Sequence, residues 1–540
     1  MDASRRRLVL AGAGGIGAMA AGAANAGPLP PAGPNEARVD VRHFGAKGDG
    51  AAIDTPAINA AIDHAASRGG GVVHFPAGTY ACFTIRLKSN ITLHLDPGAV
   101  LLAASTPREG LASGGYDQAE PQDPAIEPYQ DFGHNHWRNS MIWGEGLHDI
   151  AITGTGLLWG KGLSRGANDR DLPVAERPGV GNKLVALKNC RNVLLRDFQV
   201  LQGGHFVLLA TGVDNMAIDN LLVDTNRDGF DVDCCRNVRI SRCTINSPSD
   251  DAIVPKSSFA LGYARPIENM TVSDCLLTGG YQMGSVLDGT WKPIKPGVVP
   301  IGRFKLGTES NGDFRNITVS NCVFDRTRGV CLLTVDGGIM EDITFSGIVM
   351  SGTYQAPWFL RLGRRMRGPA GVPMGKMRRI RVSNVTSSGA GLMPSVIAGV
   401  AGHPIQDIKI SDVYLGHAGG GTAEMAALEP PAAERAYPEP RMFGELPASG
   451  FFIRHARNLE MSNVEIALER ADARPAIWME DVNEADFFRT TVRAGTAFAM
   501  KRVTGFRSFG GRSIPDARHD DAPLIRIETG AAAANQPQEP

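Results

Sequence analysis

The chain has 540 residues, a formal net charge of −1, 65 glycines and an aromatic content of 6%. A charge so close to zero provides no field that would attract nucleic acid or an anionic membrane, so neither is an expected partner. The many glycines are typical of a protein built from strands and tight turns. Any anionic ligand must then be bound by local basic residues.

Residues 1–26 have the pattern of an export signal. The run Arg5-Arg6-Arg7 is followed by a Gly/Ala-rich apolar stretch and by Ala24-Asn25-Ala26, a signal-peptidase pattern. The paired arginines predict the twin-arginine route, with a mature protein that is periplasmic or secreted. Residues 27–36 form a predicted linker. No later segment has the ~20 apolar residues needed to span a bilayer, so no membrane contact is expected of the mature form.

The first element expected after the linker is an amphipathic helix. Asp54 or Thr55 is its predicted N-cap, Pro56 lies in its first turn, and Gly69 to Gly71 end it. A helix at this place would cover the N-terminal end of a stacked β-structure, which otherwise exposes unpaired strand edges.

Short strands with one recurring pattern follow, in which Asn or an acidic residue precedes alternating apolar and polar positions. Asn192, Asn215 and Asn237 begin three of these segments at spacings of 23 and 22 residues. The segments are RNVLLRDFQV from Arg191, DNMAIDNLLV from Asp214, RNVRISRCTI from Arg236, ENMTVSDCLL from Glu268, RNITVSNCVF from Arg315, EDITFSGIVM from Glu341, QDIKISDVYL from Gln406 and RNLEMSNVEI from Arg457.

This repeat predicts a single all-β domain over residues 37–529, a parallel β-solenoid in which each repeat is one coil. A β-sandwich is the alternative, but it would not require similar strands at a 22-residue period. Polar insertions are expected at 106–137, 161–182 and 418–449, and a disordered tail at 530–540. Cys190, Cys243, Cys275 and Cys322 occupy similar places in successive repeats, which favours small buried fillers over disulfides.

Three aspartates are the main candidates for chemistry. Asp228 is 22 residues before Asp250 and 23 before Asp251, so the three carboxylates are expected to stack on neighbouring coils about 4.8 Å apart. Such a group can supply both a proton donor and a base, because repulsion raises the proton affinity of one member. The alternative is a structural ladder that binds backbone amides, the role predicted for Asp231 and Asp233.

Arg303 and Lys305 are two residues apart, so on a strand they project from the same face. There they would form a clamp for a substrate carboxylate, with Arg303 binding it through two hydrogen bonds and Lys305 acting as a point charge. The alternative is a pair of solvated surface bases.

Ordered motifs give the chain a family resemblance. FGAKGDG at 44–50, DTPAINAAI at 54–62 and FPAGTY at 75–80 resemble the start of pectin-degrading β-helix enzymes. The later N-x-D-G-F-D, S-D-D-A-I-V-P-K-S and G-R-F-K resemble the polygalacturonase family, glycoside hydrolase family 28. The resemblance implies a right-handed parallel β-helix that hydrolyses galacturonosyl or related pectic linkages with inversion. It also implies that Asp250 is the general acid and that Asp228 and Asp251 activate water.

The chain departs from the family pattern at two places. Ser249 replaces the glycine before the aspartate pair, and the family's G-H-G histidine is absent, with Tyr281 or Gln282 at the expected position. Together with the inserted segment Trp291 to Pro300, this departure predicts an altered subsite and hence exo-action or a branched substrate.

Further candidates for substrate binding are Gln282, His205 and Glu309; for His205 core packing, and for Glu309 closure of a turn, are the alternatives. His134, His136 and Trp137 could shape a sugar subsite or bind a metal. The basic segment 361–369 could extend recognition of acidic sugars or be a solvated face.

The expected partner is an acidic plant cell-wall polysaccharide or oligosaccharide, and the chain is expected to be a monomer without a cofactor. Two other classes of function remain open on this scaffold. One is a polysaccharide lyase, which commonly uses calcium held by carboxylates together with an Arg or Lys base. The other is a carbohydrate-binding or adhesin-like solenoid, which would bind without turnover.

Overall fold

The computed structural model describes residues 38–105, 115–121, 123–131, 133–164 and 177–530. The predicted export signal at 1–26, the linker at 27–36, and residues 531–540 of the predicted tail lie outside these ranges. Within them the chain forms strands that pair with strands one coil earlier and one coil later.

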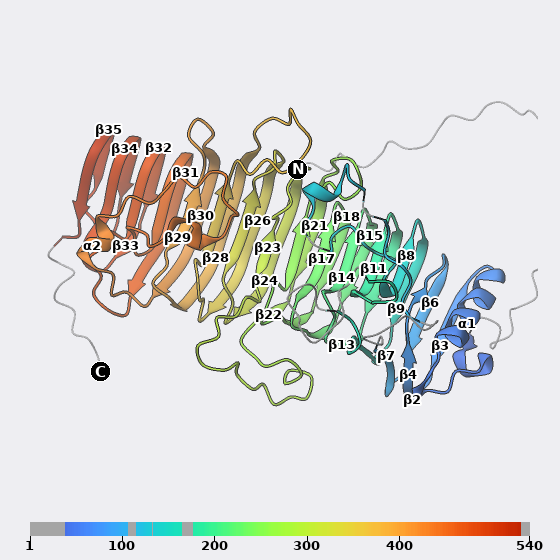
Figure 1. The fold of residues 1–540 in the computed structure, drawn as a ribbon. Coiled ribbons are helices and arrows are strands. Elements are labelled where there is room, and N and C mark those ends of the chain that lie inside the picture. Colours follow the sequence, from blue (N-terminus) through green and yellow to red (C-terminus); the bar gives the residue numbers. More distant parts are fainter. Residues whose placement is uncertain (1–37, 106–114, 122, 132, 165–176, 531–540) are drawn as a thin grey trace, which may run out of the picture.

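One coil shows how the repeat builds the fold. Strands β17 (Asp228–Asp233), β18 (Arg236–Ser241) and β19 (Thr244–Asn246) follow one another along the chain. Each pairs in parallel with its counterpart on the next coil, as Phe230 with Ile253, Val238 with Met270 and Ile245 with Leu277. Three parallel sheets, A, B and C, therefore wrap around one core in a right-handed β-helix, as predicted. The coils run from α1 at one end to β35 at the other (Figure 1).

Sheet A contains the first strand of each coil. Its members are β5 (Ile85–Arg86), β8 (Ser140–Glu145), β11 (Lys183–Lys188), β14 (Phe206–Thr211), β17, β20 (Ile253–Lys256), β23 (Phe304–Leu306), β25 (Val330–Thr334), β27 (Trp358–Leu362) and β29 (Ser395–Ala398). Sheet B contains β1 (Arg38–Asp40), β3 (Gly71–Phe75), β6 (Ile91–Leu95), β9 (His148–Thr153), β12 (Arg191–Arg196), β15 (Asp214–Asp219), β18 and β21 (Ile267–Ser273).

Sheet C contains β2 (Asp49–Ile53), β4 (Gly78–Cys82), β7 (Ala99–Ala103), β10 (Leu157–Trp159), β13 (Gln199–Leu201), β16 (Leu222–Asp224), β19 and β22 (Leu276–Thr278). Later in the chain sheets B and C are joined by long strands that pass from one to the other. These are β24 (Phe314–Asp325), β26 (Ile339–Ser351), β28 (Lys376–Ala390) and β30 (Ile405–His417). The strands that follow continue sheet A as well, because β31 (Phe451–Leu468) pairs with both β29 and β30, and β32 (Ile477–Phe488) and β34 (Thr496–Phe509) extend it. The short β33 (Thr491–Val492) pairs with β31, and β35 (Ala517–Glu528) is antiparallel to β34.

The helix expected at the N-terminal end is α1 (Thr55–Ser67). Its buried residues Ile58, Ala61, Ile62 and Ala65 have the spacing of one helix face and join the core cluster. Asp54 occupies the predicted N-cap position, but its carboxylate accepts hydrogen bonds from the backbone N–H groups of Lys47 (2.7 Å) and Gly48 (3.0 Å) instead of a helix amide. The other helices are one or two turns long: η1 (Val41–Phe44), η2 (Glu127–Tyr129), α2 (Ala423–Ala426) and η3 (Pro440–Phe443).

The recurring asparagines form a ladder at the corner between sheets A and B. The amide Nδ2 of Asn237 donates to Oδ1 of Asn215 at 3.0 Å, and the same bond repeats along the stack. Each of these residues has a φ near +55°, a left-handed conformation that Asn tolerates better than most residues. The asparagine ladder consists of Asn192, Asn215, Asn237, Asn269 and Asn316.

All eight cysteines are buried and unpaired, which confirms the prediction of fillers rather than disulfides.

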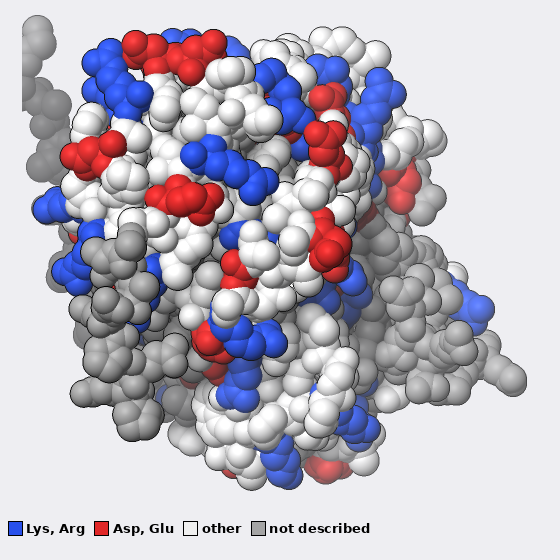
Figure 2. Space-filling view, turned by 90° about the vertical axis from the view of Figure 1, so that its left-hand side faces the viewer, with Lys and Arg blue, Asp and Glu red and all other residues white. Residues whose placement is uncertain are grey.

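At the far end, β35 closes the sheet by pairing antiparallel with β34. Figure 2 looks at this end and shows basic and acidic side chains interspersed over its surface, as the net charge of −1 suggests. None of the helices in the described ranges is long and apolar enough to cross a membrane.

Candidate active site

The structure brings Asp228, Asp250 and Asp251 together on two neighbouring coils. Asp228 begins β17, and the other two lie in the turn before β20, which pairs with β17. The backbone N–H of Asp251 donates both to Oδ1 of Asp228 (3.2 Å) and to Oδ1 of Asp250 (3.1 Å). One oxygen from each carboxylate lies within 4.8 Å of the other two. We call these residues the aspartate triad.

Asp228 is almost fully buried, and burial is the main reason that its pKa is raised well above the usual range. The negative charges of Asp250, Asp231 and Asp251 raise it further. Asp228 therefore holds a proton at pH values where an ordinary aspartate is ionised. This state is the opposite of the ionised, water-activating state that the resemblance implied for Asp228.

Asp251 has the opposite electrostatic state. Burial alone would raise its pKa, but Arg303 and Lys305 outweigh this effect and lower the pKa to about 2. Its Oδ1 accepts from Nε of Arg303 at 2.5 Å, and its Oδ2 accepts from Nζ of Lys305 at 3.1 Å. Asp251 is therefore ionised at neutral pH.

Asp250 is the triad member most open to a ligand. Its side chain is 22% exposed, whereas that of Asp251 is 2% exposed. Its Oδ2 lies 3.1 Å from NH2 of Arg227, a residue of the same motif as Asp228. A leaving-group oxygen can thus approach Asp250 more readily than the other two carboxylates.

Arg303 and Lys305 project from the same face of β23, as predicted, but they do not form an open clamp. Both are buried, and Arg303 also donates from NH1 to Oε2 of Glu439 at 3.1 Å and from NH2 to Oε1. The expectation that these two cations are free for a substrate carboxylate is wrong for this structure, because Asp251 and Glu439 already bind them. Burial opposes the charge on both, yet the pKa of each is raised well above its usual value, chiefly by Asp251.

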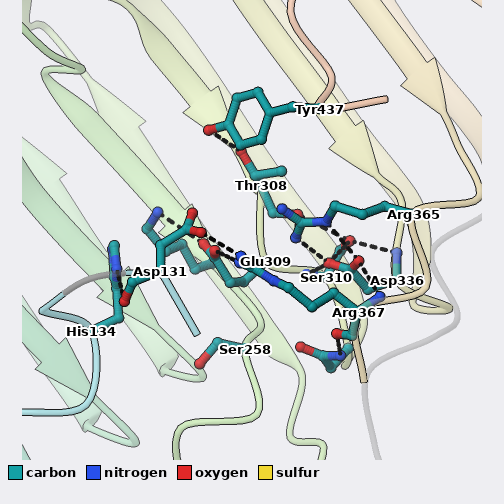
Figure 3. A network of polar contacts seen from close by, with 12 residues as sticks. Asp131, His134, Ser258, Thr308, Glu309, Ser310, Asp336, Arg365, Arg367 and Tyr437 are labelled. Atoms are coloured by element: carbon teal, nitrogen blue, oxygen red, sulfur yellow. Dashed lines mark hydrogen bonds and ion pairs between the residues drawn. The ribbon is translucent and has the colours of Figure 1, made fainter. Parts of the chain in front are cut away.

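A second group of buried charges lies near the triad, since Asp231 and Lys256 act on the charge of Asp228. Figure 3 shows His134, Glu309 and Arg367 of this group. Lys256 at the end of β20 is 3.2 Å from Glu309 and 3.5 Å from Asp231, and Nε2 of His134 is 3.2 Å from the same Asp231 oxygen. Arg367 binds Glu309 from the other side. Glu309 is thus enclosed in an internal ion network, so the predicted contact with substrate is not supported. Asp231 is part of the same network and is bound by side chains, not by the backbone amides expected of it.

Other candidates from the sequence have structural roles. His205 is buried with its ring centroid 4.3 Å from that of Phe206, which belongs to a small cluster with Trp137 outside the main core. Gln282 is exposed and its amide donates to Pro293 O at 2.8 Å inside the inserted loop. Asp233 accepts from Ser258 N at 2.9 Å and is likewise structural.

The loop with His136 and Trp137 lies against the coils. Trp137 is buried and donates from Nε1 to Oγ1 of Thr211 at 3.1 Å, and burial lowers the pKa of His136 to about 4.

In the segment 361–369, Arg361 is buried and donates to Gly399 O at 3.0 Å, and Arg365 pairs with Asp336. This segment is therefore not a solvated face.

Asp224 is a residue of the site region that sequence reasoning missed. Its Oδ2 accepts from the N–H groups of Gly284 (2.8 Å) and Val286 (2.9 Å), and its Oδ1 accepts from Asn246 (2.8 Å). The loop that follows β22 and replaces the family's G-H-G turn is thereby fixed to β16, the strand that directly precedes Asp228 in the chain. An acidic residue at a buried strand end, four positions before Asp228, was the available signal.

Glu439 and Tyr437 were also missed. They belong to the insertion at 418–449, and the OH of Tyr437 lies 3.0 Å from Oγ1 of Thr308 and 3.5 Å from Nζ of Lys305. Glu439 is 136 residues from Arg303 in the sequence, and nothing in the spacing of the insertion indicated the contact.

Comparisons with known families give two matches. The family described as Glycosyl hydrolases family 28 matches residues 125–433, more than half of the chain, including the aspartate triad. The family described as Rhamnogalacturonase A/epimerase, pectate lyase-like, matches residues 38–169.

Among similar proteins, a probable polygalacturonase of Vitis vinifera is 24% identical over 58% of this chain and 61% of its own length. An exo-poly-alpha-D-galacturonosidase of Dickeya chrysanthemi is 30% identical over 33% of this chain and 27% of its own length, so the match spans only part of either relative. A family 28 exopolygalacturonase of Yersinia enterocolitica shares the fold, with a TM-score of 0.59 and 19% identity over 83% of this chain and 78% of that one. An exopolygalacturonase of Thermotoga maritima has a TM-score of 0.57 and 19% identity over 80% of this chain and 92% of that one.

Proposed function

We propose that this chain, which belongs to glycosyl hydrolases family 28, hydrolyses α-linked galacturonosyl or related pectic linkages with inversion at the anomeric carbon. The observation that carries the proposal is the aspartate triad, in which the more exposed Asp250 lies beside a carboxyl that keeps a proton, Asp228, and one that is held ionised, Asp251. Pairs of carboxyls whose pKa values are driven apart are typical of acid/base catalysis on glycosidic bonds. The names of the relatives point to pectic substrates.

In this mechanism Asp250, the most open carboxyl, protonates the leaving oxygen. Asp251, held ionised by two cations, accepts a proton from the attacking water. Asp228 retains a proton in the free enzyme and lies next to both residues, since its Oδ1 and Oδ1 of Asp250 accept from the same N–H of Asp251. After each turnover Asp228 can give its proton to Asp250 and take up the proton that Asp251 accepted from water, so that all three carboxyls regain their starting state.

The stereochemistry is the sharpest test of this mechanism. The nearest triad oxygens lie within 4.8 Å, which is less than the about 6.5–9.5 Å between carboxyls that is common in inverting enzymes and close to the about 5–5.5 Å of retaining ones. Inversion is therefore proposed from family membership, not from this spacing.

The experiment is turnover of a panel of pectic oligosaccharides, with products identified by mass and by proton NMR before mutarotation. We expect saturated products and initial release of the β-anomer from an α-linked substrate. Initial α-anomer would overturn inversion alone. Unsaturated products with ultraviolet absorbance, lost in a chelator, would replace hydrolysis by the lyase reaction, and binding without turnover would indicate the adhesin-like class.

We further propose chain-end action or a branched substrate. The support is the loop after β22, which Asp224 fixes beside the triad, and the insertion at 418–449, which reaches Arg303. Product analysis over time distinguishes the modes, because chain-end action releases one short product from the first minutes, whereas internal cleavage produces a ladder of lengths.

Export by the twin-arginine route is also part of the proposal, supported by the pattern at residues 1–26. Replacing Arg5 and Arg6 by Lys should retain the full-length precursor in the cytoplasm. Cell fractionation and N-terminal sequencing of the mature protein, expected to begin at Gly27, provide the check.

A further inference from the structure

The insertion at 418–449, here called the strap, covers the outer face of sheet A beyond the triad. Strand alternation places Leu360 and Leu362 in the main core and Phe359 on the opposite face. Phe443, Leu446 and Ala448 of the strap join this second cluster. The strap residues cover side chains that occupy equivalent positions on successive strands of sheet A. This row begins at Lys305 and continues through Cys331, Phe359, Val396 and Phe452.

Buried arginines fix the strap to the coils. Arg361 donates to the carbonyls of Ala432 (3.0 Å) and Ala433 (3.2 Å), and Arg454 donates to Pro430 O at 2.9 Å. Arg474 donates to Leu446 O at 3.2 Å. Because the strap is bonded along its length, the position of its tip beside the triad is a fixed part of the site.

At that tip Glu439 occupies the outer edge of the Arg303 guanidinium. Its two carboxylate oxygens accept from NH1 and NH2, while Nε of the same guanidinium binds Asp251. Burial would raise the pKa of Glu439, but Arg303 lowers it, so Glu439 is ionised. The two-bond contact is the geometry by which arginine binds any free carboxylate, including that of a uronic acid.

We infer that Glu439 is a specificity-determining residue that takes the place of a substrate carboxylate on Arg303. The neighbouring subsite then accepts a neutral sugar or an esterified uronate in preference to a free uronate. This inference rests on the proposed function. A free uronate there meets the ionised Glu439 and finds the guanidinium fully engaged, and juxtaposed like charges in an occluded site disfavour binding strongly.

Tyr437 supplies a surface for such an uncharged residue. The residue is 47% exposed, and its phenol OH is bonded to Thr308 at 3.0 Å (Figure 3). A partly exposed aromatic residue with a fixed polar end suits the apolar face of a pyranose together with its hydroxyls. The strap thus offers packing to a neutral ring and repulsion to a carboxylate.

The test compares galacturonan oligosaccharides of one length in free and methyl-esterified form, using wild type and Glu439→Gln. We expect wild type to have the higher kcat/KM on the esterified form. Gln keeps the shape and one acceptor for Arg303 but removes the charge, so Glu439→Gln should shift the esterified-to-free ratio of kcat/KM by about tenfold or more toward the free acid.

Two further variants keep the result interpretable. Glu434→Gln removes a charge on the same strap, paired only loosely with Arg364 at 3.6 Å, and should leave the ratio unchanged. Glu439→Asp keeps the charge and should keep the preference for the ester. A wild-type preference for the free acid, or a Glu439→Gln ratio within about twofold of wild type, would overturn the inference while leaving hydrolysis established. Absence of turnover on every substrate would instead overturn the proposed function, and this inference with it.

Discussion

Two corners of the same coils carry stacks of polar side chains with opposite consequences. At the corner between sheets A and B, the asparagine ladder joins amide to amide at about 3 Å along five coils. At the corner that leads into sheet A, Asp228, Asp250 and Asp251 come together with one oxygen of each within 4.8 Å of the others. An amide has both a donor and an acceptor and satisfies its neighbours, whereas an ionised carboxylate only accepts. The same stacking that makes asparagines structural therefore makes aspartates reactive.

The charge conflict at the aspartate corner is resolved in two ways. Asp228 keeps a proton, and Asp251 is paired with two buried cations. The two residues thus contribute to stability with opposite pH dependence. The contribution of Asp251 is present above its unfolded pKa of 3.8 and is lost as the pH falls toward about 2. That of Asp228 is present below 3.8 and is lost as the pH rises through its raised folded pKa.

The largest expected effect is that of Asp251→Asn, which makes the aspartate corner resemble the asparagine ladder. The variant leaves the buried cations of Arg303 and Lys305 without their shared carboxylate. Breaking a buried ion pair by removing one partner costs ~3–5 kcal/mol. We expect a loss of this size in the free energy of unfolding measured in urea, together with loss of turnover.

The matched control for this prediction is Lys305→Met, alone and combined with Asp251→Asn. Removing both charges should recover part of the loss. The loss in the free energy of unfolding of the double variant should therefore be smaller than the sum of the two single losses by ~1 kcal/mol or more. Additive single effects would mean that the pairing does not explain the state of Asp251.

The next effect is on catalysis alone. Asp250→Asn keeps the oxygen that accepts from Asp251 N–H but cannot donate a proton, so kcat should fall by ~10²- to 10⁴-fold while the melting temperature stays near that of wild type. Asp219→Asn, at the outer corner between sheets B and C, is the control and should keep its activity. An Asp250→Asn rate within a few-fold of wild type would remove Asp250 from the chemistry.

Much of this fold was predictable because one local requirement repeats. Asn192, Asn215 and Asn237 each occupy a left-handed turn and bond to their neighbour, so the spacing of 22 to 23 residues directly reflects the length of one coil. The convergence of the triad follows from the same spacing. Cys243, Cys275 and Cys322 are buried fillers for the same reason, since they occupy equal positions in successive repeats and stack inside one core. Cys190 is also buried in that core, but it lies at the corner before sheet B.

The electrostatics of the site were not predictable, because they depend on which groups are buried and on contacts from distant segments. The sequence shows three neighbouring aspartates but not that Asp251 is the one paired with Arg303 and Lys305, which leaves Asp228 as the buried carboxyl whose pKa is raised. The clamp expected from Arg303 and Lys305 is closed by Glu439, which lies in an insertion without periodicity. Glu309 was expected to touch substrate from its place after β23, yet Lys256 and Arg367 enclose it.

A smaller effect, of opposite sign, is expected from Asp228→Asn. The amide needs no proton to remain neutral and still accepts from Asp251 N–H, so it removes the loss of stability that Asp228 causes as the pH rises. One unit of pKa shift corresponds to ~1.4 kcal/mol. Thermal unfolding should show variant and wild type nearly equal below pH 3.8 and the variant more stable at neutral pH. A constant difference across this range would show that Asp228 titrates normally.

The smallest effect tests the asparagine ladder itself, through Asn237→Gly and Asn237→Ala. Glycine keeps the left-handed backbone at φ 56° and loses only the two ladder bonds, to Asn215 and from Asn269, so its cost should be ~1–2 kcal/mol. Alanine loses the same bonds and adds ~1 kcal/mol of left-handed strain. Urea unfolding of the pair separates the two contributions, and kcat should be unchanged in both. If Asn237→Gly lost activity while remaining folded, the two corners would be coupled, and the division into a structural ladder and a reactive triad would fail.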